Sequence, residues 1–301
     1  MLLDIVIIAE YLVLFMGNSG TSVFQPTPNV KERHARALYI NVPVSHEIIH
    51  NVLHAPCVAD QHNGHCWISI VIDDLDMLEA YVLGTYIPTG LKGWMCKVNL
   101  LVKCPVPSVG EANIPTEDVH GYQILTIDFE DVTGGQLKAW GAKYTQHIPS
   151  STAHFEVSSG VSGTSIHSPL ENDCPYSAVM TSNGEPLVSV TGVLRSSLSP
   201  QQVEFTRFVT DRPHKFLHQD CRSLDKSIHR GTASRLAYSP EDGDGASFSH
   251  AGCVWLEAEA IALPVLDRLG GGVLQQVDLK HAQCFIQPYY ILVDHHNITL
   301  S

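Results

Sequence analysis

The stretch from Ser45 to Cys104 constrains the fold more than any other part of the chain. It opens with a predicted helix over His46–His54, because Ser45 is a favoured N-cap residue and Pro56 stops the helix. The dipeptide Asn63-Gly64 then predicts a tight turn, since both residue types accept left-handed backbone angles. A chain that passes from a short helix through such a turn is expected to enter a strand.

Two apolar strands complete this stretch. The first is the β-branched run Trp67–Ile72, and the second is Lys97–Lys103, in which Val98–Val102 lies between two lysines. Between them, Asp73–Leu83 is compatible with a second short helix or with a wide loop, because Leu75, Leu78 and Val82 share a helical face. The order is therefore helix, turn, strand, excursion and strand.

Most of the remaining periodic segments also read as strands, namely Arg36–Val42, Gly121–Phe129, Glu185–Leu194 and Cys284–Val293. Gly121–Phe129 and Gln136–Tyr144 are expected to form a hairpin around Gly134-Gly135. Gln201–Leu217 has helix or strand character, and Val254–Leu269 has the clearest helical pattern, with Pro264 as a kink or boundary. Many strands with few, short helices predict an α+β fold that is mainly an antiparallel β-barrel.

The composition narrows the class of protein. Hydrophobic residues make up 44% and charged residues 16%, which indicates a globular chain, and the formal charge of -13 argues against a nucleic-acid surface. Eight scattered cysteines without a CxxC pair predict reduced, buried thiols.

We divide the chain into an apolar N-terminal element and loop (1–30) and a single barrel domain (31–301). Asp4 and Glu10 interrupt the apolar N-terminus, so neither a membrane span nor a signal peptide is expected, and the protein is predicted to be cytoplasmic.

The familiar cofactor motifs are missing from the sequence. It contains no GxGxxG or P-loop motif, so neither nicotinamide nor nucleotide chemistry and no cofactor is expected. It also lacks a GxSxG motif, which argues against a Ser-His-Asp hydrolase. His46, His50 and His54 stand at helical spacing and suggest a metal-enzyme alternative, since imidazoles at i and i+4 can chelate zinc. A half-exposed histidine face is the preferred interpretation, because no third ligand is suitably spaced.

Lys97 and Lys103 are the candidates for nucleophilic chemistry. A lysine becomes a nucleophile when a dry cavity favours its neutral form, and residues six apart on a regular strand share a face. A strand of that length holds them roughly 20 Å apart, so spacing alone does not show that they cooperate. The alternative is that both lysines extend from the strand ends to solvent.

With these residues in hand, the stretch resembles the acetoacetate decarboxylase superfamily, and particularly its uncharacterised bacterial and fungal members. These proteins have a strand and a helix that leads through a polar turn into a β-branched strand. The Lys97–Lys103 strand is similar to the one that carries the superfamily's glutamate and Schiff-base lysine. The other counterparts are Ala37–Val42, His46–His54, Asn63-Gly64, Trp67–Ile72, Gly121–Phe129 and Phe285–Val293.

The resemblance implies a barrel or cone with a cavity for a small or medium carbonyl compound. Lys103 takes the position of the lysine and Lys97 that of the glutamate, so this chain lacks the superfamily's acid and its Pro-Lys-Lys sequence. The resemblance thus makes Lys103 the candidate nucleophile and leaves decarboxylation, aldol-type chemistry, dehydration and cyclisation open. Asp128 and His50 are candidate helpers, and the cavity lining is expected to include Trp67, Trp94, Tyr122 and Tyr290.

Two other functions remain as alternatives. The barrel could bind or shape an apolar ligand without covalent chemistry, in which case Lys103 would be exposed and dispensable. A histidine-ligated metal enzyme would instead carry stoichiometric metal. We expect a small-molecule substrate, no nucleic acid and no membrane as partners, and assembly into a homo-oligomer is left open.

Overall fold

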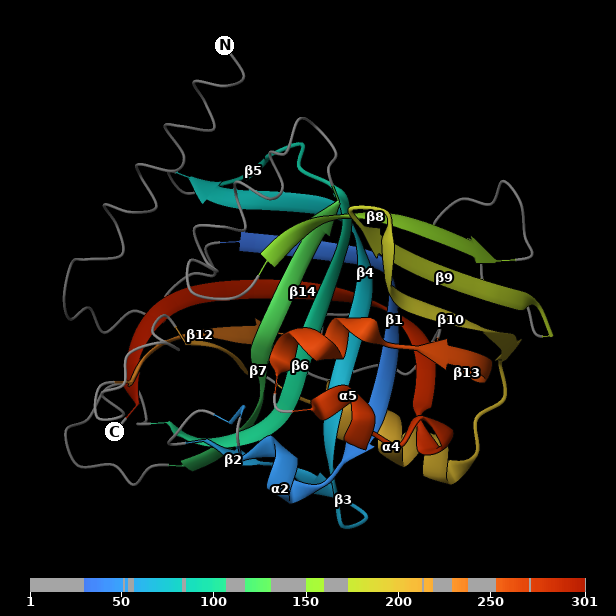
Figure 1. The fold of residues 1–301 in the computed structure, drawn as a ribbon. Helices are drawn as coiled ribbons and strands as arrows, with labels where there is room; N and C mark the ends of the chain where they lie inside the picture. The colour runs from blue at the N-terminus through green and yellow to red at the C-terminus, as the bar shows by residue number, and fades with distance from the viewer. Residues whose placement is uncertain are drawn as a thin grey trace.

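A computed structural model provides the structure of this chain (Figure 1). It describes residues 30–50, 52–53, 57–82, 85–106, 117–130, 150–159, 173–212, 214–218, 229–237, 253–270 and 272–300. The expected N-terminal element and the expected hairpin partner Gln136–Tyr144 lie outside these residues. The division at residue 30 therefore stays a prediction.

One continuous sheet of fourteen strands makes up most of the described chain. Its strands are β1 (Val30–Val44), β2 (Val58–Ala59), β3 (Gln61–His62), β4 (His65–Val82), β5 (Thr85–Pro88), β6 (Gly93–Val106), β7 (Glu117–Glu130), β8 (Ser150–Ser159), β9 (Pro175–Ser182), β10 (Glu185–Arg195), β11 (His214–His218), β12 (His229–Ala237), β13 (Val254–Ala262) and β14 (Gln283–Leu300). The pairings are antiparallel except β7 with β8 and β7 with β11. The predicted fold class, mainly antiparallel β with a few short helices, is confirmed.

The sheet closes on itself twice. A seven-stranded ring runs β14-β1-β4-β6-β7-β11-β12 and closes where β12 pairs with β14. A nine-stranded ring uses the same five strands β14, β1, β4, β6 and β7, then continues through β8, β9, β10 and β13 back to β14. The five shared strands form a wall between two interiors, with β12 on one side of it and β9, β10 and β13 on the other (Figure 1).

The shared wall explains why its strands are apolar on both faces. Successive side chains of a strand point to opposite faces, so each shared strand must serve two interiors. On β4, Ile68, Ile70 and Ile72 belong to the hydrophobic cluster of the nine-stranded ring, whereas Trp67 and Val71 belong to that of the seven-stranded ring. A run of consecutive large apolar residues is therefore required here.

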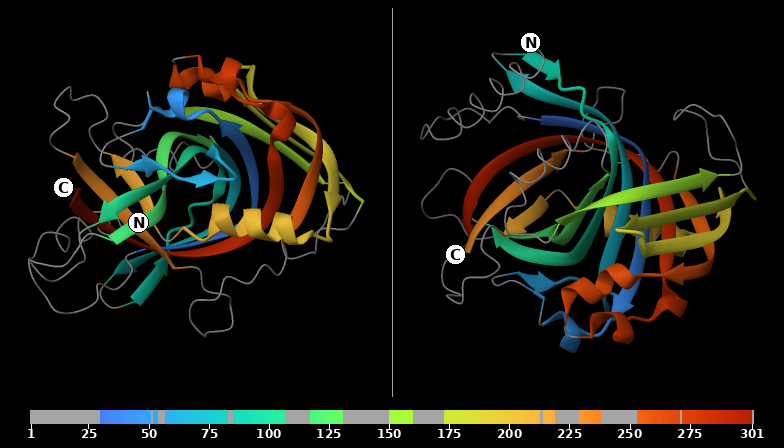
Figure 2. Two further views of the ribbon diagram at one scale, coloured as in Figure 1. Left: turned by 90° about the horizontal axis from the view of Figure 1, so that it is seen from below. Right: turned by 45° about the horizontal axis from the view of Figure 1, so that its top comes forward.

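Short helices cover part of each ring. Helix α4 (Pro200–Thr210) is capped by Ser199 in a capping box and places Phe205 and Val209 in the seven-stranded ring's cluster. The 3-10 helix η2 (Pro264–Leu269) and helix α5 (Val273–Gln276) contribute to the nine-stranded ring's cluster. Figure 2 shows α4 in gold well apart from η2 and α5 in red. Among the described residues, the other helices are α2 (His46–Ile49) and η3 (Leu279–His281).

Three local predictions were wrong. Val254–Leu269 is not one helix but β13 followed by η2, because pairing with β10 and β14 outweighs its helical spacing and the break falls before Pro264. Asp73–Leu83 is neither helix nor loop, since β4 continues through it to Val82 against β1. The helix predicted over His46–His54 ends at Ile49.

The cysteines partly follow the prediction. Five described cysteines are free: Cys66, Cys96, Cys174, Cys253 and Cys284. Burial raises the pKa of the Cys253 thiol to about 11 and that of Cys284 to about 12. Cys57, however, is disulfide-bonded, so the expectation of reduced thiols fails at this position. Sequence spacing does not show which cysteines a fold brings together across neighbouring strands.

Candidate functional site

The two ring interiors differ in chemistry. The nine-stranded ring holds mainly aliphatic side chains, and Ile40, Ile70 and Val98 on its wall have no exposed surface. The opposite face of the shared strands adds aromatic and polar side chains to its apolar ones, namely Tyr39, Trp67, Asp73, Lys97, Asn99 and Tyr122. We therefore take the seven-stranded ring as the candidate site.

An ion pair lies inside this ring. The Nζ atom of Lys97 on β6 donates to Oδ2 of Asp73 on β4 at 2.8 Å, and the two side chains are 7% and 0% exposed. The strand register explains the contact, because Lys97 pairs with Val71 and Asp73 is the next residue of β4 on the same face. Burial disfavours the charged form of Asp73, but Lys97 and His34 outweigh it and hold the pKa of this carboxyl well below its usual range. Asp73 is therefore a carboxylate in the resting protein.

Two residues of β1 extend the pair. Nδ1 of His34 lies 3.3 Å from Oδ1 of Asp73, and its Nε2 lies 3.1 Å from Oε2 of Glu32. His34 is fully buried and Glu32 nearly so. A bulge between His34 and Ala37 shifts the register of β1 against both β4 and β14 at this point. Lys97, Asp73, His34 and Glu32 thus form a continuous chain of charged or ionisable groups inside the protein.

Tyr39 of β1 lies near this chain of groups, because it pairs with Val71 of β4, which in turn pairs with Lys97. Its ring stacks on Phe285 with centroids 4.7 Å apart, and only 5% of the residue is exposed. Burial, followed by the charges of Tyr122 and Asp73, raises its pKa well above the usual value. Tyr39 is therefore a neutral hydroxyl that can donate or accept a hydrogen bond.

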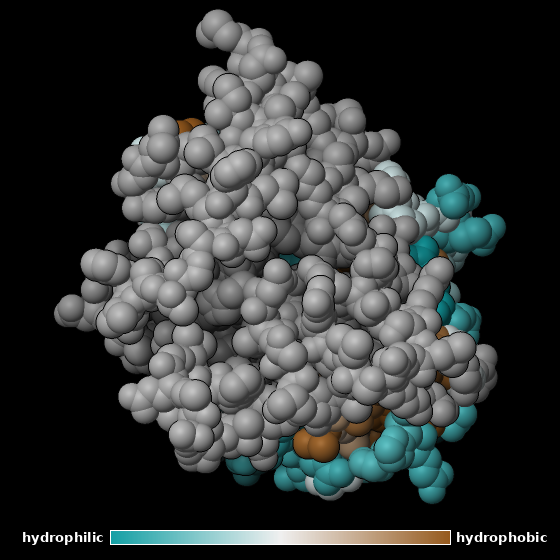
Figure 3. All heavy atoms as spheres, turned by 90° about the vertical axis from the view of Figure 1, so that its left-hand side faces the viewer, coloured by the Kyte–Doolittle hydropathy of each residue, from teal (hydrophilic) through white to brown (hydrophobic). Residues whose placement is uncertain are grey.

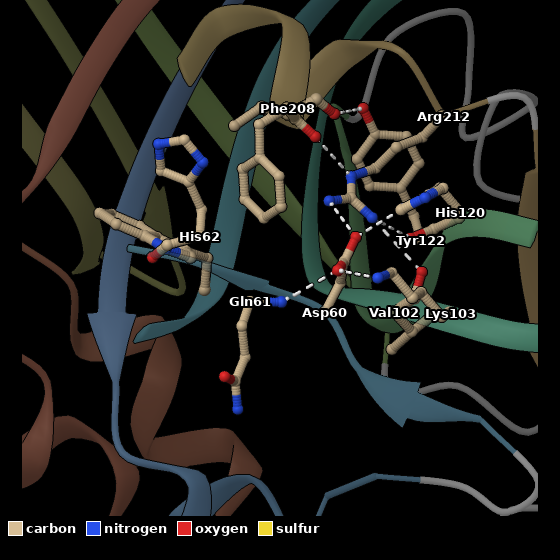
Figure 4. A network of polar contacts seen from close by, with 12 residues as sticks. Asp60, Gln61, His62, Val102, Lys103, His120, Tyr122, Phe208 and Arg212 are labelled. Atoms are coloured by element: carbon tan, nitrogen blue, oxygen red, sulfur yellow. Dashed lines mark hydrogen bonds and ion pairs between the residues drawn. The ribbon is translucent and has the colours of Figure 1, made fainter. Parts of the chain in front are cut away.

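Lys103, the candidate nucleophile from the sequence, lies in a different network (Figure 4). Its Nζ is 3.3 Å from Oδ1 of Asp60, and its side chain is 40% exposed. Oδ2 of Asp60 also contacts His120 at 2.6 Å and the fully buried Arg212 at 3.0 Å. Burial disfavours ionisation of Asp60, but Arg212, His120 and Lys103 lower its pKa. Lys103 is thus one of three cationic or ionisable partners of a single carboxylate.

Arg212 is held in place by the backbone around it. Its guanidinium donates to the carbonyl oxygens of Phe208, Val102 and Gly121, and it lies 4.6 Å from the centre of the Phe208 ring. These contacts join the end of α4 to β6 and β7. The network around Asp60 therefore has a structural role at the α4 end of the seven-stranded ring.

Asp128 does not lie with either lysine. Its side chain is fully buried on the nine-stranded ring's side of β7, where Oδ1 accepts from the backbone N–H and hydroxyl of Ser151. Both of its oxygens accept from Nη1 of Arg268 at 2.8 and 2.9 Å. These hydrogen bonds use most of the acceptor capacity of the Asp128 carboxylate and join β7, β8 and η2, so Asp128 has a structural role.

The structure divides the residues expected to line a cavity. Trp67 and Tyr122 belong to the seven-stranded ring's cluster. Trp94 faces the other ring and stacks against Phe155, and His50 is exposed at the end of α2 beside His46. The side chain of Tyr290 is outside the described part. Trp67 and Tyr122 are thus the expected lining residues that the structure places in one cluster.

Sequence reasoning missed Asp73, His34 and Glu32. Asp73 follows the apolar run Trp67–Ile72 directly, and an acid inside a strand buried on both faces is an informative exception. The sequence offered no such signal for His34 and Glu32, because a polar segment before a strand is ordinarily a loop. Asp73 on β4 places an acid beside Lys97 of β6.

The described surface also has a hollow on the nine-stranded ring, lined by residues of β8, β9, β10 and β13 that include Tyr176, Thr191 and Glu259. Seen from the side in Figure 3, its coloured part is mostly hydrophilic, with a small hydrophobic area at the lower edge. Only Val58 and Ile87 are large exposed hydrophobic residues in the described ranges. Within those ranges, no helix is long and apolar enough to cross a membrane, and no group of three His, Cys, Asp or Glu side chains is arranged to hold a metal ion.

Comparison with solved structures identifies the fold. An acetoacetate decarboxylase-like enzyme from Sphingomonas wittichii RW1 matches with a TM-score of 0.53 at 10% identity, covering 94% of this chain and 99% of that one. Acetoacetate decarboxylase from Legionella pneumophila matches with 0.54 at 9% identity, covering 96% and 95%. The enduracididine biosynthesis enzyme MppR, complexed with pyruvate, matches with 0.53 at 12% identity, covering 94% and 95%.

These similarities show that the chain has the acetoacetate decarboxylase-like fold, as its sequence resemblance predicted. No protein-family model matches the sequence. No curated protein matches it either.

Proposed function

We propose that the protein is an enzyme that binds a small or medium keto compound inside the seven-stranded ring and activates it as an imine of Lys97. One observation carries this proposal: the Lys97 amine is buried, with the Asp73 carboxylate 2.8 Å away. Enzymes that use lysine nucleophiles need an enclosed amine and a group that exchanges protons with it. Lys97 meets both requirements, whereas the amine of Lys103 is half-exposed at the Asp60 network.

The fold supports the same class of substrate. Proteins described as acetoacetate decarboxylases share it, and the MppR structure contains pyruvate, a 2-oxo acid. The sequence identities are 9–12%, so the reaction of this chain is a separate question from its fold. We therefore propose a keto or oxo acid as the substrate class and leave the bond that is broken or formed to experiment.

Asp73 would handle the protons of imine formation. The Lys97 ammonium passes one proton to the Asp73 carboxylate, and the neutral amine adds to the substrate carbonyl to give a carbinolamine. Asp73 then returns its proton to the carbinolamine hydroxyl, which leaves as water while the C=N bond forms. The product is a protonated imine beside a carboxylate, so the ion pair is restored. A protonated imine withdraws electrons from the adjacent carbon, which serves decarboxylation and aldol-type chemistry alike.

Borohydride trapping tests the proposal. The protein is incubated with a panel of β-keto and 2-oxo acids, reduced, digested and mapped by mass spectrometry. An adduct on Lys97 is the expected result, and it should also form in Lys103→Met, the matched control. An adduct confined to Lys103 would restore the assignment made from the sequence and overturn that of Lys97.

A second candidate is a barrel that binds its ligand without covalent chemistry. The observation in its favour is that the Lys97 amine is already engaged by Asp73, as in a purely structural buried ion pair. The same experiment separates the two. Folded protein that binds a keto acid but gives no adduct on any lysine would refute the imine mechanism and support the binding barrel.

A further inference from the structure

A row of polar side chains crosses the interior of the seven-stranded ring beside Lys97. Asn41 on β1 pairs with Ser69 on β4, and Ser69 pairs with Asn99 on β6. Asn99 follows Lys97 by two residues, so both side chains point to the same face. Asn41 and Ser69 are fully buried, and Asn99 is 4% exposed. Three adjacent strands thus place an amide, a hydroxyl and a second amide in one layer.

Two atoms of this layer make no hydrogen bond to the described residues. Asn41 uses its Nδ2 to donate to the carbonyl oxygen of Gln283 at 2.9 Å, which leaves its Oδ1 without a donor. The Oγ of Ser69 also has no partner in the described part of the chain. The first can only accept a hydrogen bond, and the second can donate or accept one.

Such atoms need an explanation, because buried polar groups in folded proteins are nearly always hydrogen-bonded. Leaving one unpaired costs about 1–3 kcal/mol, whereas an aliphatic side chain of similar size would avoid the cost. The opposite faces of the same three strands show that this chain uses that solution freely: Ile40, Ile70 and Val98 are adjacent there and fully buried. The polar layer is thus confined to the face where the candidate nucleophile lies.

We propose that Asn41 and Ser69 form a subsite for a hydroxyl group of the substrate, so that the enzyme acts on a hydroxylated oxo acid. The inference rests on the proposed function, because it places the carbonyl carbon at Lys97. A hydroxyl can donate to Oδ1 of Asn41 and accept from Oγ of Ser69 at the same time. An ammonium group fits less well, since Asn41, Ser69, Asn99 and their register neighbours Gln283 and Ile124 carry no charge.

The strand geometry sets the length of this substrate. Two residues along a strand correspond to roughly 7 Å, so the hydroxyl lies several bonds from the carbonyl carbon. The subsite lies between Lys97 and the aromatic end of the ring, where Trp67 packs on Phe205 of α4 with centroids 4.7 Å apart. The hydroxyl is therefore expected at the far end of a chain of about six carbon atoms that starts at the carboxylate.

Two matched acids test the subsite: α-oxohexanoate and its ω-hydroxy counterpart. Their binding is measured by calorimetry without borohydride, and their trapping is measured in parallel. The ω-hydroxy acid should bind roughly 5- to 30-fold more tightly, which corresponds to one hydrogen-bonded group. Ser69→Ala and Asn41→Leu should abolish this preference. Ser177→Ala on β9, outside the seven-stranded ring, is the control and should keep the preference.

The outcomes separate the subsite from the proposed function. Equal binding of both acids, or a preference that survives Ser69→Ala and Asn41→Leu, would overturn the subsite and show that internal water serves these atoms. Preferential binding without any trapped adduct would retain the subsite and overturn the imine. Stability gives a further check, because Ser69→Ala should leave the ligand-free protein equally or more stable. A loss of stability would show that the Ser69 hydroxyl is structural.

Discussion

Breaking the Lys97–Asp73 pair is the sharpest test of the site's electrostatics. The side chains of Lys97 and Asp73 are 7% and 0% exposed and joined at 2.8 Å, so removal of either one leaves a charge inside the ring. Breaking a buried pair typically costs 3–5 kcal/mol, whereas replacing both partners by apolar residues is often neutral or stabilising. We expect Lys97→Met and Asp73→Leu each to cost about 3–5 kcal/mol and the double variant to recover most of that loss.

Urea unfolding of the wild type, both single variants and the double variant gives the coupling energy. We expect a coupling energy of at least about 3 kcal/mol, because each single variant leaves one buried charge without its partner and the double variant leaves neither. Arg195 and Glu257 supply a matched control: they are joined at the same 2.8 Å, but their side chains are 38% and 58% exposed. Exposed pairs couple by about 0.2–1 kcal/mol. A coupling at Lys97–Asp73 no larger than this would refute the view that the amine is enclosed.

The pH dependence of the same variants has a defined sign. The pKa of Asp73 is lowered in the folded protein, so the stability that its carboxylate contributes is fully present above the ordinary carboxyl range and is lost as the pH falls from that range to the lowered pKa. The wild type and Asp73→Leu should therefore converge in stability on acidification. Divergence on acidification would contradict the assigned ionisation state.

Two further predictions concern the frame around the site. Gly192→Ala should lower the free energy of unfolding, measured in urea or by heating, by more than about 3 kcal/mol, because the added Cβ would lie 2.2 Å from the carbonyl oxygen of Glu257. A variant as stable as the wild type would contradict the close approach of β10 and β13. Asp60→Asn should make stability fall less steeply as the pH is lowered. The pKa of Asp60 is lowered in the folded protein, so its stabilising contribution is present above the ordinary carboxyl range and is lost below it. An unchanged dependence of stability on acidic pH would show that the Asp60 carboxylate does not stabilise the fold.

Local sequence patterns correctly indicated much of the architecture. The turn at Asn63-Gly64 has φ angles of 52° and 79°, which these residue types accept, and it joins β3 to β4 as predicted. The strands Trp67–Ile72, Lys97–Lys103 and Gly121–Phe129 are all present within β4, β6 and β7. The predictions failed where helical spacing competed with pairing, as at Val254–Leu269 and Asp73–Leu83. There, partners distant in sequence decided the conformation.

The candidate site also separates what local sequence patterns determine from what contacts between distant segments determine. The sequence by itself determined that Lys97 and Lys103 would share one face of a strand, because side chains alternate with a period of two. Only the tertiary structure decided that this face closes into the seven-stranded ring and that Asp73 lies against Lys97. It also decided that Lys103 lies half-exposed against Asp60. Asp128, in contrast, faces the nine-stranded ring, where it contacts Arg268 and Ser151. Alternation is a local property of the backbone, whereas register and ring closure depend on contacts between distant segments.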